Sequence, residues 1–130
     1  MIQTTEDLEA QLDRIERKYE RLADGTYLVS VGRAQPAVAM RVAPPVLVMQ
    51  VVVGKVGAAE ADRRAALFQR LLELNAKSLL HAAYGLDGDS IMIAAALELE
   101  SADPNEIEAV LADIDVALAE HVPLLRELVG

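Results

Sequence analysis

The chain has 130 residues, 53 % hydrophobic and 25 % charged, a composition that fits one globular domain spanning residues 1–130. Its net charge of −9 disfavours binding to nucleic-acid phosphates, and the absence of cysteine excludes disulfides, thiolate catalysis and cysteine-based metal sites. No apolar run approaches the roughly eighteen residues of a membrane helix and no secretory signal pattern opens the chain. We therefore expect a cytoplasmic protein that does not insert into membranes.

The N-terminal segment predicts a helix over about residues 4–23. Its hydroxyl cap and acidic first turn lie in Thr4-Thr5-Glu6-Asp7, and Asp24-Gly25 supplies a stop. Apolar residues recur at spacings of three and four, which forms a narrow stripe. This stripe packs along one side of the domain, or lends part of itself to a partner. The candidate partner-binding residues are Leu8, Leu12, Ile15 and Tyr19.

Three strands are predicted next, over Tyr27–Val31, Val38–Val42 and Val46–Val53. The third has no polar face apart from Gln50, so both of its sides should be covered. Helices of a small domain cover one face of an antiparallel sheet, and the other face then needs a second chain. The glycines around Lys55 lack the spacing of a phosphate-binding loop and predict a turn into a helix.

A second helix is predicted over about residues 58–76, with Asn75 as its stop. From Leu79 the apolar period changes to two, and Asp87-Gly88-Asp89 predicts the tight turn of a hairpin. The second arm of the hairpin runs from Ser90 to Leu99. The order of elements is α-β-β-β-α-β-β-α, and this pattern predicts an α+β fold with an antiparallel five-stranded sheet.

A third helix is predicted over about residues 104–121. Asp103 caps it, Pro104 takes its first position and Glu106 completes a capping box. Pro123 lacks the amide hydrogen that a helix interior needs, so we expect a kink or a restart there.

No group of residues forms a recognisable catalytic or metal-binding motif. His81 and His121 lack the spacing of a zinc helix, and we expect both to serve packing or solvent contacts. The carboxylates of Glu98, Glu100 and Asp103 are explained by a strand end and a helix cap. We therefore predict a protein that is not an enzyme and has no cofactor and no metal site.

Short motifs between Leu71 and Ile114 resemble those of known bacterial families. Leu71-Leu72 with Leu74-Asn75 ends the second helix, Tyr84-Gly85-Leu86-Asp87-Gly88 leads into the turn, and Leu97, Leu99 and Glu100 precede Asp103-Pro104. This series resembles the class I type III secretion chaperones (the Tir-chaperone family) and the YbjN-like sensory transduction regulators.

The resemblance implies the secretion-chaperone fold and a small acidic homodimer that holds an extended segment of an effector or other client. Strand addition at a sheet edge, with apolar pockets, would hold that segment. The alternative is a YbjN-like regulator of the same fold with no secretion role.

Surplus apolar surface also predicts a homodimer. Residues 46–53 and 91–96 are apolar on both faces, and a two-fold dimer lets one patch cover itself. We expect the second helix and the hairpin to build the interface, as the resemblance also implies. The candidate contributors are Leu67, Leu71, Leu74, Leu80 and Ile93.

Overall fold

The computed structural model describes residues 2–32, 35–57 and 60–129. Its strands form one antiparallel six-stranded sheet in the order β1-β2-β3-β4-β6-β5. The strands are β1 (Tyr19–Arg21), β2 (Tyr27–Val29), β3 (Val38–Ala43), β4 (Val46–Lys55), β5 (Ala83–Asp87) and β6 (Ser90–Glu98). The helices are α1 (Thr5–Arg14), α2 (Ala61–Lys77), α3 (Pro104–Val116) and α4 (Val122–Val129), with a 3-10 turn η1 (Leu99–Ser101) and a π turn η2 (Ala117–His121). The predicted α+β antiparallel fold is confirmed, and the predicted count of five strands is one too low.

The extra strand comes from the N-terminal segment, where the prediction of one helix over residues 4–23 is wrong. Helix α1 ends at Arg14, and Glu16 takes the left-handed conformation with φ of 59°. The chain then reverses, and β1 pairs with β2. Gly25, expected to end the helix, lies between β1 and β2 with φ of 89°. The apolar residues of this segment keep a spacing of three to four residues through Tyr19 by chance, and this spacing led to the prediction of a longer helix. The aromatic ring of Tyr19 also suits a strand.

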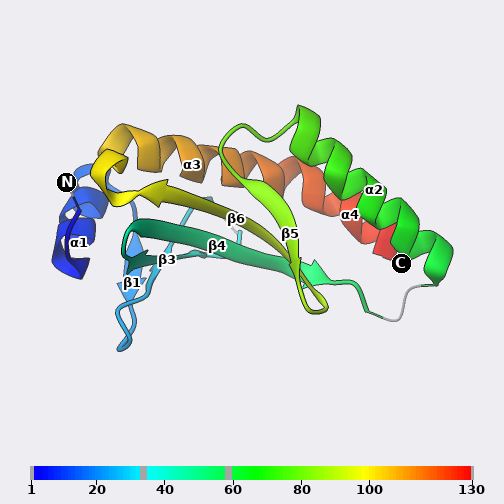
Figure 1. Ribbon diagram of the computed structural model, residues 1–130, viewed down its shortest axis with the longest axis horizontal. Coiled ribbons are helices and arrows are strands. Elements are labelled where there is room, and N and C mark those ends of the chain that lie inside the picture. The colour runs from blue at the N-terminus through cyan, green and yellow to red at the C-terminus, as the bar shows by residue number, and fades with distance from the viewer. Residues whose placement is uncertain (1, 33–34, 58–59, 130) are drawn as a thin grey trace.

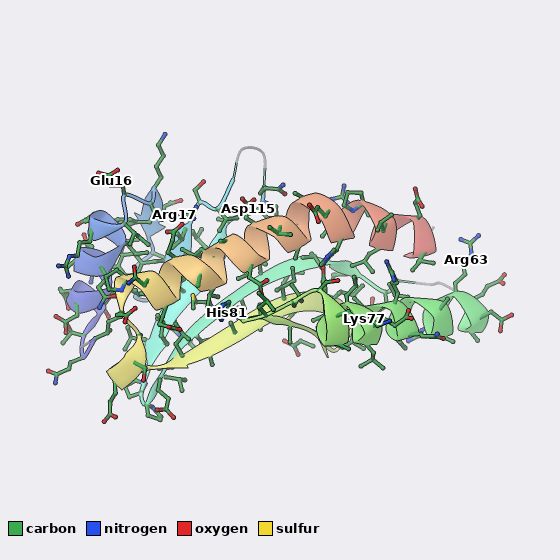
Figure 2. The ribbon with its side chains drawn as sticks, turned by 90° about the horizontal axis from the view of Figure 1, so that it is seen from above. Glu16, Arg17, Arg63, Lys77, His81 and Asp115 are labelled. Carbon is green, nitrogen blue, oxygen red and sulfur yellow. The ribbon has the colours of Figure 1, made fainter. Side chains whose placement is uncertain are left out.

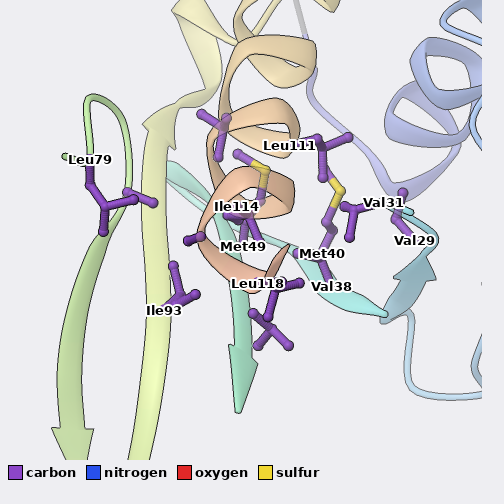
Figure 3. Close-up of a cluster of buried hydrophobic side chains, with 14 of the residues drawn as sticks. Val29, Val31, Val38, Met40, Met49, Leu79, Ile93, Leu111, Ile114 and Leu118 are labelled. Atoms are coloured by element: carbon purple, nitrogen blue, oxygen red, sulfur yellow. The ribbon is translucent and has the colours of Figure 1, made fainter. Parts of the chain in front are cut away.

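The helices α2, α3 and α4 lie on one face of the sheet, while α1 lies at the end near β1 (Figure 1). Side chains alternate along β4: Leu47, Met49 and Val51 are buried, whereas Val52 is 52 % exposed. Figure 3 shows Met40 and Met49 of the sheet beneath Leu111 and Ile114 of α3. The core therefore lies between the helices and one sheet face, and the other face of the sheet carries the exposed side chains of β4.

The C-terminal half follows its predicted turn and cap signals. Gly88 has φ of 59°, which the hairpin turn between β5 and β6 requires. The Asp103 side chain accepts a hydrogen bond of 2.8 Å from the backbone N–H of Glu106. The predicted restart near Pro123 is present: the Val122 N–H donates to Ala117 O in the π turn, and α4 begins at Val122.

Two element boundaries differ from the predictions around α2. The helix begins at Ala61 within the described residues, and it continues past the predicted stop at Asn75 to Lys77. Residues 58 and 59 of the predicted helix lie outside the described residues. Strand β5 begins at Ala83 rather than Leu79, since the intervening chain is held to α3 by side-chain hydrogen bonds. In the part of the chain described here, no helix has the length and apolar character to cross a membrane.

Candidate functional site

The structure places four of the five predicted interface residues inside the chain's own core. Leu67 and Ile93 are 0 % exposed, and Leu71 and Leu74 are 5 % and 4 % exposed. Leu80, in the connection between α2 and β5, is 85 % exposed. Leu67, Leu71 and Leu74 attach α2 to the core, and Ile93 attaches β6 to it. Contact of any of the five with a second copy stays a prediction.

Apolar side chains that were not among the predicted interface residues are exposed beside these residues. Leu72 on α2 is 68 % exposed and Leu86 on β5 is 49 % exposed. Together with the half-buried Phe68 they line a hollow of about 170 Å³ between the helix and the strand. We call Phe68, Leu72 and Leu86 the α2–β5 surface. Because β5 is the last strand of the sheet, its outer backbone groups border this surface.

The amide of Asn75 attaches the end of α2 to β5. The Tyr84 N–H donates to Asn75 Oδ1 at 2.6 Å, and Asn75 Nδ2 donates to the Tyr84 carbonyl at 3.1 Å. The two hydrogen bonds have the pattern that a neighbouring strand would form with Tyr84. Asn75 therefore fixes the position of β5 relative to α2. The sequence analysis treated Asn75 as a helix stop and missed this role.

Asp113 of α3 holds the connection between α2 and β5. Its carboxylate accepts hydrogen bonds from three successive backbone N–H groups, at 2.9 Å from His81, 3.0 Å from Ala82 and 3.2 Å from Leu80. Hydrogen bonds to an ionised acceptor are stronger than those to a neutral one. This cradle fixes the segment that carries the exposed Leu80.

A buried polar pair lies beneath the same strand. The Tyr84 hydroxyl and His121 Nδ1 are 3.0 Å apart, and each residue is less than a tenth exposed. Burial lowers the pKa of His121 below its ordinary value of 6.5; among the smaller effects on this pKa, Glu120 raises it, Arg70 lowers it and Asp113 raises it. Burial also raises the pKa of the Tyr84 hydroxyl.

The lowered pKa of His121 predicts an acid-sensitive fold. In the unfolded chain His121 binds a proton near pH 6.5, whereas in the folded chain it does so only at lower pH. The contribution of neutral His121 to the free energy of unfolding is therefore complete above about pH 6.5 and falls as the pH drops below it. We expect the urea midpoint to fall between about pH 7 and about pH 5.5. His121→Phe should lose less over the same interval. An equal fall in both proteins would contradict this role of His121.

The predicted partner-binding stripe is divided between two environments. Leu8 and Leu12 are buried in the core, whereas Ile15 and Tyr19 are half-buried. The Tyr19 hydroxyl donates to Asp13 at 2.8 Å, and Glu9 accepts from the Tyr27 hydroxyl at 2.7 Å. These bonds attach β1 and β2 to α1. Binding of a partner by the stripe stays a prediction.

Strand β1 is the other end of the sheet, opposite β5. Arg17, just before it, pairs with Glu108 of α3 and donates to the Val31 carbonyl at 3.2 Å. These contacts attach the start of β1 to α3, and Figure 2 shows Arg17 close to α1. A fixed edge strand presents unpaired backbone groups that another extended chain can join.

The titratable residues singled out from the sequence do not converge. His81 is exposed and its backbone N–H bonds to Asp113, whereas the His121 ring is buried against Tyr84. Within residues 2–32, 35–57 and 60–129, no three His, Asp or Glu side chains form a group that could hold a metal ion. The prediction that the protein uses no metal or cofactor stays a prediction.

The helices cover one face of an antiparallel sheet whose edge strands are β1 and β5, which is an α+β architecture. The chain belongs to the CesT_Tir_1 family, whose model matches residues 1–129. The resemblance predicted from the sequence is thereby confirmed. No curated protein matches the chain.

Three solved structures show the shared fold. A chain of the heterodimeric ExoU–SpcU complex, from the type III secretion system of Pseudomonas aeruginosa, is 16 % identical with a TM-score of 0.62, over 85 % of this chain and 84 % of that one. The Yersinia pestis secretion chaperone SycH, in complex with a fragment of YscM2, is 18 % identical with a TM-score of 0.59, over 88 % and 99 %. YbjN from E. coli is 9 % identical with a TM-score of 0.60, over 92 % and 95 %. Both families named by the resemblance therefore have this fold.

Proposed function

We propose that this protein is a non-catalytic chaperone or adaptor that forms a homodimer and holds an extended segment of a client protein. The observation that carries the proposal is the α2–β5 surface, where large apolar side chains stay exposed beside the last strand of the sheet. The family and its solved complexes support it, because SycH is in complex with another protein's fragment and ExoU–SpcU is a heterodimeric complex.

The homodimer would form by packing the α2–β5 surface against its own copy. Leu72 and Leu86 project from a helix and a strand that are fixed to each other by Asn75. A two-fold axis through such a patch buries it completely, and this is the commonest arrangement of soluble oligomers. The buried residues Leu67, Leu71 and Leu74 would then support the interface from behind.

The client segment would add to the sheet at β1, the edge that the dimer leaves open. Main-chain hydrogen bonds would supply part of the affinity, and alternate side chains would enter apolar sites beside α1. The half-buried Ile15 and Tyr19 lie next to this edge and are the candidate contacts.

Hydrogen exchange tests the proposed client site. The protein is co-expressed with the product of its neighbouring gene, and amide exchange is compared with that of the protein alone. We expect the outward amides of Tyr19 and Arg21 to become strongly protected in the complex, and Arg21→Pro, which removes one of these outward N–H groups, to weaken capture at least about tenfold. Gln50→Pro on the interior strand β4 is the reference for loss of capture by unfolding. Glu73→Pro is unsuitable as a control, because it would break α2.

The similarity to YbjN supports a second candidate function, a regulatory protein of the same fold without a secretion client. The same experiment separates the two. A stable complex with protection at β1 supports the chaperone, whereas a neighbour-encoded protein that does not bind, or that binds without protecting β1, contradicts it.

A further inference from the structure

A depression that shares no lining residue with the α2–β5 surface lies between α4 and the end of β4. Two hollows, of about 260 Å³ and about 220 Å³, share Val53, Val122 and Arg126 and so are continuous with each other. Together they fall within the roughly 300–1,000 Å³ of pockets that hold small ligands. We call this depression the α4 groove and define it by Val53, Lys55, Leu118, Val122, Leu125 and Arg126.

The walls of the α4 groove are largely aliphatic and are held in place by the core. Leu118 and Val122 are each less than a tenth exposed, and Val53 is half-buried. Gln35 and Pro36 line the larger hollow beside Val53. The chain therefore borders this hollow on the β4 side as well as on the α4 side, and a slender aliphatic chain fits such a recess better than another polypeptide strand does.

The charge of the α4 groove is opposite to that of the chain. The sequence carries 21 acidic and 12 basic residues, yet the described residues that line the groove include Lys55 and Arg126 and no Asp or Glu. Both cations are exposed, and neither takes part in an ion pair with another described residue. Arg126 lines both hollows and Lys55 lines the smaller one. The positive charge and the aliphatic walls therefore face the same space.

Two cations suit one anionic group and not an extended anionic surface. Anionic membranes are recognised by clusters of about four to eight Lys and Arg residues, and nucleic acids also need clustered cations. The net charge of −9 opposes the approach of either surface. The guanidinium of an arginine, in contrast, matches a single carboxylate through two parallel N–H groups. The groove therefore favours one carboxylate that is joined to an aliphatic body.

We propose that the α4 groove binds a small amphipathic carboxylate, a free acid with an unbranched aliphatic chain. Its carboxylate would lie in the smaller hollow, between Lys55 and Arg126, and its chain would extend past Val122 into the larger hollow. Burial of the chain supplies affinity, and the two cations select the charged end. This inference goes beyond the proposed function, which concerns protein partners alone.

Amide NMR of the full chain, titrated with sodium octanoate, tests the groove. Octan-1-ol has the same chain without the charge, and acetate has the same charge without the chain. We expect octanoate to give saturable shifts at the amides of residues 53–55 and 118–126. Octan-1-ol and acetate should each bind at least about tenfold more weakly than octanoate. Arg126→Gln should weaken octanoate binding about tenfold, and Lys55→Gln about threefold.

Arg63→Gln is the control, because Arg63 is an exposed cation in the first turn of α2, outside the groove, and its replacement removes the same charge (Figure 2). It should leave octanoate binding unchanged. Equal affinity for octanoate and octan-1-ol overturns the proposal, as does unchanged octanoate affinity in both Arg126→Gln and Lys55→Gln. Octanoate shifts that are absent, or that are confined to the α2–β5 surface, overturn it as well.

Discussion

Leu72→Asp is expected to halve the mass of the native particle while leaving the chain folded, and Leu71→Asp is expected to unfold it. The two residues are neighbours on α2 but point about 100° apart. Leu72 is 68 % exposed on the α2–β5 surface, whereas Leu71 is 5 % exposed in the core. An unpaired carboxylate at position 71 should cost about 4 kcal/mol or more of the free energy of unfolding.

Light scattering and far-ultraviolet circular dichroism measure the two outcomes separately. Val52→Asp is the matched control, because Val52 is 52 % exposed on β4, which β6 separates from β5. It should retain both the dimer mass and the fold. A folded Leu72→Asp protein that keeps the dimer mass would place the interface elsewhere.

Asp113→Ala is expected to lower the free energy of unfolding by about 3 kcal/mol. The substitution removes the acceptor for the backbone N–H groups of Leu80, His81 and Ala82. Water replaces it at the exposed Leu80 and His81, whereas the N–H of the buried Ala82 loses its partner. Because the cradle fixes the start of β5, amide exchange should increase first in that strand and in the connection before it.

Urea unfolding measures this loss, and Asp87→Ala provides the comparison. Asp87 is an exposed carboxylate at the end of β5, so its replacement should change the free energy by about 0.5 kcal/mol or less. An Asp113→Ala protein as stable as Asp87→Ala would show that the cradle contributes nothing to the fold.

The parts of the fold that depend on local signals could be predicted from the sequence. The turn at Gly88 and the cap at Asp103 are each set by residues within a few positions, and both have the expected geometry. The N-terminal segment could not be predicted in the same way. Its reversal at Glu16 depends on contacts with distant elements, among them the pairing of Arg17 with Glu108.

The structure places most of the predicted interface residues in the core and exposes other apolar residues of the same elements. Periodicity identifies the apolar face of α2, yet it does not separate the face that enters the core from the flank that stays exposed. Leu67, Leu71 and Leu74 define the buried face, and Leu72 lies on the flank. Asn75 and Asp113 act through backbone groups of the connection and of β5, so their roles follow from tertiary structure alone.

The mass of the wild-type particle tests the central claim, that the exposed α2–β5 surface is covered by a second copy. Light scattering at micromolar concentration should give twice the 14.0 kDa of one chain. A mass of 14.0 kDa under the same conditions would contradict the homodimer.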